Sequence, residues 1–341
     1  MKSQNLILDI LRVLPKKIIQ YIAGPPIIID GNTLDPNMQI ITKLISEEQQ
    51  KILVSPEELR RATKKLDQIA IRNIPGITIK NQEIDASTGK MKIRTYQKNV
   101  DQENAPAILF FHQGGLVIMD TKTDDYFCSL LANKCRAKVI SLDYRRCPEN
   151  EFPAAFEDAF ALWDYAQINS DILNINPELI ALVGDSAGGM ISATLAHDLR
   201  DRGGVQPAAL GLIYPWVTTS IENQKSIESC ADVFPMTFEI MEFFRNTVFP
   251  NGHNINHPWA NPLYQKDLSN FPTTIIATAG FDPIRDQGNE YAELLKKAGN
   301  NVVNYCFNHL PHSFLIFGRV SKAAQKANII IAEELSKILN N

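Results

Sequence analysis

Short apolar runs alternate with longer amphipathic segments from residue 77 onwards, and this alternation predicts strands and helices in turn. Runs of strand length lie at residues 77–84, 91–97, 107–111, 138–144, 180–184, 209–214, 273–279 and 302–307. Segments with helical spacing lie at 123–134, 154–166, 187–202, 285–298 and 321–339. Strands that alternate with helices of this length favour a mostly parallel sheet with helices on both faces. The sequence therefore predicts an α/β fold with an eight-stranded sheet, whose first two strands form an antiparallel pair.

Two segments depart from this alternation. Residues 1–72 have helical and irregular patterns, and residues 217–261 are rich in Phe and Pro. We expect an N-terminal cap segment at 1–72 and a main domain at 73–341, which carries a cap insertion at about 217–261. Together the two segments would form a helical cap over the carboxyl-terminal edge of the sheet, where ligands bind in such folds.

Composition narrows the class of protein. The chain has 341 residues, of which 45% are hydrophobic and 21% charged, as in ordinary globular proteins with a sizeable core. The net charge of −4 and the absence of a basic stripe argue against a nucleic-acid partner. The five cysteines are scattered and have no CxxC spacing, which favours reduced thiols in a cytoplasmic protein.

The N-terminal segment predicts no transmembrane span. Its longest uncharged run, at 18–29, is too short to cross a bilayer and contains Gly24-Pro25-Pro26. The simplest interpretation of residues 1–29 is an amphipathic helix that packs on the protein. The alternatives are a helix that lies on a membrane surface, as a peripheral contact, or one that lies over the functional site.

Candidate chemistry centres on Gly184-Asp185-Ser186-Ala187-Gly188, which follows an apolar run and begins a helical pattern. A strand, a sharp turn and a helix form the context of a G-x-S-x-G nucleophile elbow. The turn would hold the Ser186 hydroxyl above the sheet at a helix N-terminus. Glycines would flank it because the turn is tight and because φ values accessible to glycine are needed there. This pattern predicts a serine nucleophile.

A serine nucleophile needs a base and a group that orients the base. In this type of fold the acid and then the histidine follow the serine in the sequence. Asp282 and His312 each follow a predicted strand, and we expect them to be the acid and the base. The alternatives are a helix N-cap role for Asp282 before Pro283, Asp286 as the acid, and a surface position for His312.

The tetrahedral oxyanion of such chemistry needs hydrogen-bond donors. The stretch His112-Gln113-Gly114-Gly115 follows a predicted strand at the place of an HGGG-type loop. The backbone N–H groups of Gly114, Gly115 and Ala187 are the expected donors, and an ordinary turn is the alternative. Pairs of histidines three or four residues apart lack further ligands, so the sequence predicts no metal. No phosphate-binding loop is present, and we expect no cofactor.

These motifs together resemble those of the hormone-sensitive-lipase-like family of α/β hydrolases, the bacterial family IV esterases. Further similar stretches are Asp143-Tyr144-Arg145, Pro148-Glu149, Phe152-Pro153-Ala154-Ala155, Leu212-Ile213-Tyr214-Pro215, Asn261-Pro262, Asp282-Pro283-Ile284-Arg285-Asp286 and His312-Ser313-Phe314. The resemblance covers about residues 75–320. It implies an α/β-hydrolase fold and a Ser186–His312–Asp282 triad, without a cofactor.

The chain departs from the family pattern at three positions. Gln113 stands where the family has the first glycine of H-G-G-G, and Ser313 replaces the glycine after the histidine. Met190 replaces a common Asn after the elbow, with an expected effect on packing only. At 113, either a positive φ would strain the glutamine or its amide would reach into the pocket.

The resemblance implies hydrolysis of short- to medium-chain acyl esters through an acyl-enzyme. A receptor on the same scaffold is one alternative, but plant gibberellin receptors, which resemble this family, lack the triad histidine that is present here as His312. An amidase or a lactonase with the same triad is the other alternative. The strand at 302–307 is a candidate edge for pairing in a homodimer.

Overall fold

The computed structural model describes residues 14–49, 55–70, 74–99 and 103–340. Its main sheet has eight strands in the order β10-β9-β8-β7-β5-β6-β4-β3. Their bounds are β3 Ile77–Ala86, β4 Gly89–Lys98, β5 Ala105–Phe111, β6 Lys138–Asp143, β7 Ile175–Asp185, β8 Ala209–Ile213, β9 Thr274–Phe281 and β10 Val302–Pro311. Only the β3–β4 and β4–β6 pairs of this sheet are antiparallel. The predicted mostly parallel sheet and its antiparallel first pair are therefore confirmed.

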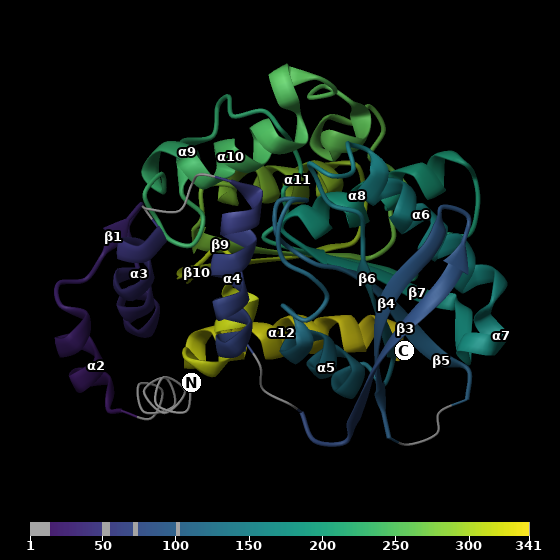
Figure 1. Cartoon of the computed structure of the whole chain (residues 1–341), viewed down its shortest axis with the longest axis horizontal. Helices are drawn as coiled ribbons and strands as arrows, with labels where there is room; N and C mark the ends of the chain where they lie inside the picture. The colour runs from purple at the N-terminus through teal and green to yellow at the C-terminus, as the bar shows by residue number, and fades with distance from the viewer. Residues whose placement is uncertain (1–13, 50–54, 71–73, 100–102, 341) are drawn as a thin grey trace.

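Helices cover both faces of this sheet (Figure 1). One layer contains α6 (Ala154–Ile168), α8 (Ala187–Asp201) and α11 (Arg285–Lys297). The opposite layer contains α5 (Asp125–Lys134) and α12 (Lys322–Leu339). These five helices lie where the sequence predicts them. The short helix α7 (Ser170–Leu173) was not predicted.

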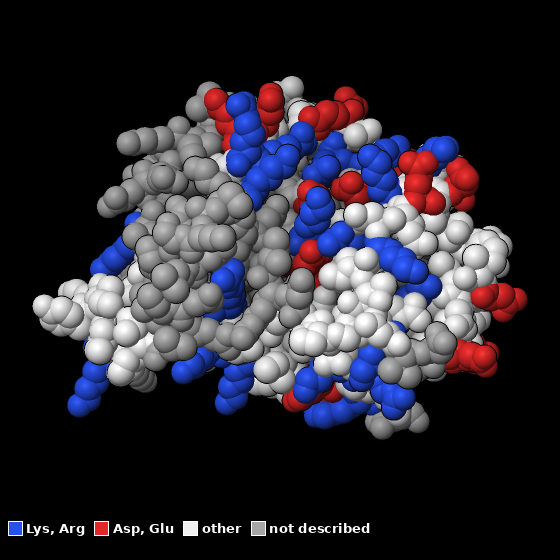
Figure 2. Space-filling model, turned by 60° about the horizontal axis from the view of Figure 1, so that its bottom comes forward, with Lys and Arg blue, Asp and Glu red and all other residues white. Residues whose placement is uncertain are grey.

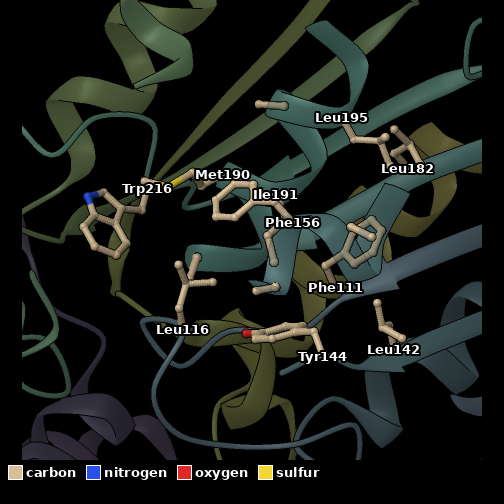
Figure 3. Packing of buried hydrophobic residues seen from close by; sticks show 14 of the residues in the cluster. Phe111, Leu116, Leu142, Tyr144, Phe156, Leu182, Met190, Ile191, Leu195 and Trp216 are labelled. Carbon is tan, nitrogen blue, oxygen red and sulfur yellow. The ribbon is translucent and has the colours of Figure 1, made fainter. Parts of the chain in front are cut away.

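The core lies between the sheet and these helices. Every residue of β5, β8 and β9 is buried, as expected for strands covered on both faces. Figure 3 shows Phe156 of α6 and Ile191 of α8 packed over the strand residues Phe111 and Leu182. This packing fixes the start of α8 against the end of β5, two places where the sequence predicts functional residues.

Two strands extend furthest beyond their predicted bounds, by four or more residues. β7 begins at Ile175 because its first residue pairs with Ala105 before a register shift. β10 continues to Pro311 through a register shift after Phe307, and Pro311 pairs with Phe281 of β9. A shift of this kind is not visible in an apolar pattern, because the extra residues do not continue the strand's alternation.

The N-terminal segment adds α2 (Lys16–Ala23), α3 (Pro36–Gln49) and α4 (Pro56–Ala70), with a small sheet of β1 (Ile28–Ile29) and β2 (Asn32–Thr33). Residues 1–13 of the predicted amphipathic segment, and the predicted boundary between 72 and 73, lie outside the described residues. The Asp35 N–H donates to the His309 carbonyl of β10 at 2.9 Å, so this segment covers part of the sheet edge. Pairing of β10 in a homodimer stays a prediction.

The 217–261 segment contains α9 (Lys225–Ser229), α10 (Phe238–Val248) and the 3-10 turns η1 (Pro250–Gly252) and η2 (Pro258–Ala260), followed by η3 (Pro262–Tyr264). It lies beyond the α11 side of the sheet, on the same side as the upper end of α4 (Figure 1). Asp30 joins the N-terminal segment to it: the carboxylate accepts a hydrogen bond from Ser229 and pairs with Arg285 at 2.8 Å.

The cysteines, the surface charges and the helix lengths bear on the expectations drawn from composition. All five cysteines are free, and only Cys306 is exposed. On the described part of the face in Figure 2, basic and acidic side chains lie beside each other, without a continuous surface of one sign. Among the described residues, no helix combines the length and the apolar character that crossing a membrane requires.

Candidate active site

Ser186 lies at the turn between β7 and α8, with φ 53° and ψ −117°. A non-glycine residue with positive φ is strained, and such strain is often found at functional sites. The flanking glycines are needed for another reason than the predicted φ values. A Cβ at Gly188 would lie 1.8 Å from the Phe111 carbonyl oxygen, so helix α8 approaches β5 too closely for any side chain. The left-handed residue of the elbow is the serine itself.

The sheet register brings the other two predicted residues together. Pro311 and Phe281 are partners at the ends of β10 and β9, so the next residues, His312 and Asp282, leave the sheet side by side. His312 Nδ1 lies 2.7 Å from Asp282 Oδ2, and His312 Nε2 lies 2.9 Å from Ser186 Oγ. All three side chains are buried, with exposed fractions of 3% or less. The structure thus forms a continuous hydrogen-bonded chain from carboxylate to hydroxyl.

The two oxygens of Asp282 have different partners. Asp282 Oδ1 accepts the N–H of Ile284 at 2.9 Å, so the carboxylate also organises the turn before α11. Asp286 faces elsewhere: its Oδ2 accepts the Ser226 N–H at 2.9 Å, and its Oδ1 pairs with Arg285. Asp282 therefore serves both the turn and His312, whereas Asp286 takes no part in the contact with His312.

Tyr214 and Asp185 support the site, and the sequence analysis assigned no role to either. The Tyr214 ring lies 4.8 Å from the His312 ring, and its hydroxyl donates to Asp185 Oδ2 at 2.8 Å. Burial raises the pKa of Asp185 well above its usual value. The sequence could have pointed to both residues through their positions, Tyr214 in the stretch Leu212-Ile213-Tyr214-Pro215 and Asp185 in the elbow.

The glycine loop after β5 borders the same site. Gly115 has φ 61°, and a Cβ there would lie 2.2 Å from the Phe244 ring, so the loop packs directly against α10. Gln113, Gly114 and Gly115 line a cavity that also contains Ser186 and His312. Ala187 begins α8, and the first N–H groups of a helix have no partner within it. Gly114 and Gly115 therefore border the same cavity as Ser186, and Ala187 directly follows Ser186. Their role as oxyanion donors stays a prediction.

Gln113 does not have the positive φ that would strain it, and its amide instead lies among polar groups. Gln113 Nε2 donates to Asp124 Oδ1 at 3.3 Å, and Gln113 Oε1 accepts a hydrogen bond from the Ser313 hydroxyl. Of the two expectations for this position, the one in which the amide reaches toward the pocket agrees with the structure.

Two small cavities flank Ser186. One, of about 40 Å³, is lined by Leu59 and Thr63 of α4 and by Ile240 of α10, among others. The other, of about 10 Å³, is lined by side chains that include Trp216, Met241 and Ile284. Phe244 and Met236 border both cavities. Side chains from the N-terminal segment and from the 217–261 segment therefore enclose the site together.

Helix α4 is held over the site by Arg60. Its Nε donates to the Val117 carbonyl at 2.7 Å, just after the glycine loop, and its other nitrogens bind the Cys147 carbonyl and Glu149. A larger open depression, of about 710 Å³, runs between Arg200 and Lys266 and includes none of the three site residues. The two small cavities are thus the ones that concern the chemistry.

Metal ligation has no support among the described residues, which contain no group of three or more His, Cys, Asp or Glu side chains arranged around one point. The pairs that the sequence brought up have other contacts. His257 Nδ1 accepts the Trp259 N–H at 3.1 Å, and His312 binds Asp282 and Ser186.

Comparison with known proteins identifies the family. A sequence model of the α/β hydrolase fold matches residues 108–316, which is more than half of the chain. The chain therefore belongs to this family, as its resemblance to the hormone-sensitive-lipase-like members predicts.

Individual relatives agree. Carboxylic ester hydrolase LipN of Mycobacterium tuberculosis is 31% identical over 307 residues, which cover 86% of this chain and 80% of the relative. The arylesterase of Saccharolobus solfataricus is 30% identical over 270 residues, which cover 78% of this chain and 86% of the relative. A hyperthermophilic esterase from the archaeon Pyrobaculum calidifontis has a TM-score of 0.79 at 31% identity, covering 86% of this chain and 97% of that structure.

Because His112 is buried, we expect the stability of the fold to decrease at acidic pH. Its ring stacks on Tyr144 at 4.2 Å, and complete burial lowers the pKa of His112 to about 4. The unfolded chain, where histidine has a pKa of about 6.5, then binds more protons below that pH. The free energy of unfolding should fall by up to about 3 kcal/mol between about pH 6.5 and 4 through this group. The test is urea unfolding of the wild type and of His112→Asn at several pH values. If the free energy of unfolding fell equally with pH in both proteins, the prediction would be contradicted.

Proposed function

We propose that the protein is a serine hydrolase of carboxylic esters, with Ser186 as nucleophile, His312 as general base and Asp282 as the residue that orients the base. The observation that carries this proposal is the hydrogen-bonded chain Asp282–His312–Ser186 at the elbow before α8. A serine hydroxyl becomes an effective nucleophile when a base accepts its proton and a third group holds the base in place. The esterase names of the relatives support the same activity.

The geometry suggests the sequence of steps. Ser186 Oγ attacks the ester carbonyl while His312 Nε2 takes the hydroxyl proton, and Asp282 stabilises the resulting imidazolium. The N–H groups of Gly114, Gly115 and Ala187 hold the oxyanion of the tetrahedral intermediate. His312 then gives its proton to the leaving alcohol, which departs and leaves an acyl-enzyme. Water attacks this ester with His312 again as base, and Ser186 regains its proton as the acid is released.

The cavities support short- to medium-chain acyl esters as substrates. Both are lined largely by apolar side chains, and both are small, at about 40 Å³ and 10 Å³. The test is a panel of p-nitrophenyl esters of rising acyl length, from acetate to laurate. We expect kcat/KM to be highest among the shorter chains. Stoichiometric binding without turnover of any ester would instead favour the receptor alternative.

Ester and amide substrates share the first steps, so the panel includes an amide with a matched acyl group. We expect p-nitrophenyl butyrate to be hydrolysed much faster than butyryl p-nitroanilide. A butyrolactone tests the cyclic esters. Faster turnover of the anilide or the lactone would move the assignment to an amidase or a lactonase with the same residues.

Phe244→Ala should widen the acyl preference. The Phe244 ring borders both cavities beside Ser186, so its removal joins them. Burial of two further methylene groups, worth about 1.6 kcal/mol, raises kcat/KM by roughly tenfold. We therefore expect the ratio of kcat/KM for octanoate over acetate esters to rise about tenfold. Phe243→Ala, a neighbour on α10 that borders neither cavity, is the control. An equal rise in both variants, or none in Phe244→Ala, would refute the role of the ring.

A further inference from the structure

A buried hydrogen bond joins two loops of the site that lie far apart in the sequence. The Ser313 hydroxyl donates to Gln113 Oε1, and the Gln113 amide nitrogen donates in turn to Asp124 Oδ1 at 3.3 Å. The exposed fractions of Gln113 and Ser313 are 1% and 6%. Gln113 directly precedes Gly114, and Ser313 directly follows His312. One side-chain contact therefore connects the loop of the oxyanion donors to the loop of the general base.

Both residues are unusual for their places. Ser313 has φ 58° and ψ 23°, in the left-handed region where glycine is favoured and a side chain is strained. Gln113 and Ser313 are also the positions at which the H-Q-G-G and H-S-F stretches depart from the glycines of the family pattern. A serine kept in a strained conformation, with its hydroxyl bound to the other unusual residue, indicates that the two side chains act as a pair.

We propose that Gln113 and Ser313 form a positioning pair, whose hydrogen bond holds the oxyanion loop and His312 in their reactive arrangement. The pair acts through Gly114 and His312 rather than on the substrate, and its role rests on the proposed ester hydrolysis. Misplacement of reacting groups by about 1 Å can cost about 10²-fold in rate. Loss of the hydrogen bond should therefore lower kcat and leave KM nearly unchanged.

Loss of one partner leaves the other side chain buried without their shared hydrogen bond, whereas loss of both removes the two groups together. Each Gln113 variant also removes the donor to Asp124 Oδ1, in the single and in the double variant alike. Ser313→Gly removes the hydroxyl and relieves the left-handed backbone. Gln113→Met keeps the volume of the side chain and removes its hydrogen bonds. Gln113→Gly provides a second form of the same loss, with the residue of the family pattern.

The experiment is a double-mutant cycle on p-nitrophenyl butyrate with Ser313→Gly and each Gln113 variant. We expect each single variant to lose about tenfold in kcat with KM changed less than twofold. The double variants should lose no more than about twentyfold, well short of the product of the singles. In Ser313→Gly, relief of the left-handed backbone offsets the cost of the lost hydrogen bond to Gln113, so the unfolding temperature should change little while kcat falls.

Other results would overturn the pair. Losses in kcat that multiply in the double variants would show that the two residues act independently. Changes confined to KM would show that they only line the pocket, and an unchanged kcat in Ser313→Gly would remove its role. These outcomes leave the proposed function intact as long as the wild type turns over esters. A wild type that hydrolyses no ester would overturn both proposals.

Discussion

Ser186→Ala is expected to lower kcat for ester hydrolysis about 10⁶-fold, because members of such a triad act as a unit. The Ser186 hydroxyl is the group that lies 2.9 Å from His312 Nε2, and no acyl-enzyme can form without it. KM should change little, since the cavity walls stay in place. The measurement is kcat for p-nitrophenyl acetate and butyrate, with active-site titration of the wild type to fix the enzyme concentration.

Ser192→Ala is the matched control for this variant. Ser192 is buried on the same helix, α8, and its hydroxyl does not border either cavity. We expect it to keep kcat within about twofold, by analogy with substitutions that touch no reacting group. If Ser186→Ala retained most of the ester hydrolysis, or if both variants lost activity equally, Ser186 would not be the nucleophile.

The site was predictable where local patterns determine geometry. The run from β7 through Ser186 into α8 contains strand, turn and helix within one short stretch, so its shape follows from nearby residues. The choice of Asp282 and His312 followed from the order of acid and histidine after the serine in this type of fold, and from their places directly after predicted strands. The structure adds the reason why they touch, which is the pairing of Phe281 with Pro311.

Other features depend on distant packing and were not predictable. Gly188 is needed because α8 lies against Phe111 of β5, a contact between segments that no local pattern records. Leu59 and Thr63 reach the cavity because Arg60 ties α4 to the Val117 and Cys147 carbonyls. Tertiary contacts of this kind are fixed only when the whole chain is folded.

The partnership of Gln113 and Ser313 shows the same limit. Each residue stood out in the sequence as a departure from the family pattern, and each was interpreted alone. Their contact spans 200 positions of the chain, so only the folded structure places one beside the other. Backbone strain was one of the two expectations for Gln113, and the structure has a positive φ at Ser313 instead.

Asp282→Asn should lower kcat about 10⁴-fold while the fold is kept. The carboxylate holds the His312 tautomer that has its proton on Nδ1 and leaves Nε2 free to accept from Ser186. An amide nitrogen in its place would donate to Nδ1 and force the proton onto Nε2, where it blocks proton transfer. The other amide atom can still accept the Ile284 N–H, so the turn before α11 should survive. The measurement is kcat together with the unfolding temperature.

Asp286→Asn is the control that separates the two acids of the Asp282-Pro283-Ile284-Arg285-Asp286 stretch. Asp286 binds the Ser226 N–H and Arg285, and neither contact leads to His312. Its variant should therefore keep kcat within about twofold, with at most a small loss of stability because the ion pair is partly exposed. Equal losses of kcat in the two variants, or a larger loss in Asp286→Asn, would contradict the assignment of Asp282 as the one carboxylate that orients His312. A loss confined to Asp282→Asn assigns the orienting role to the single carboxylate that both closes the turn and binds the base.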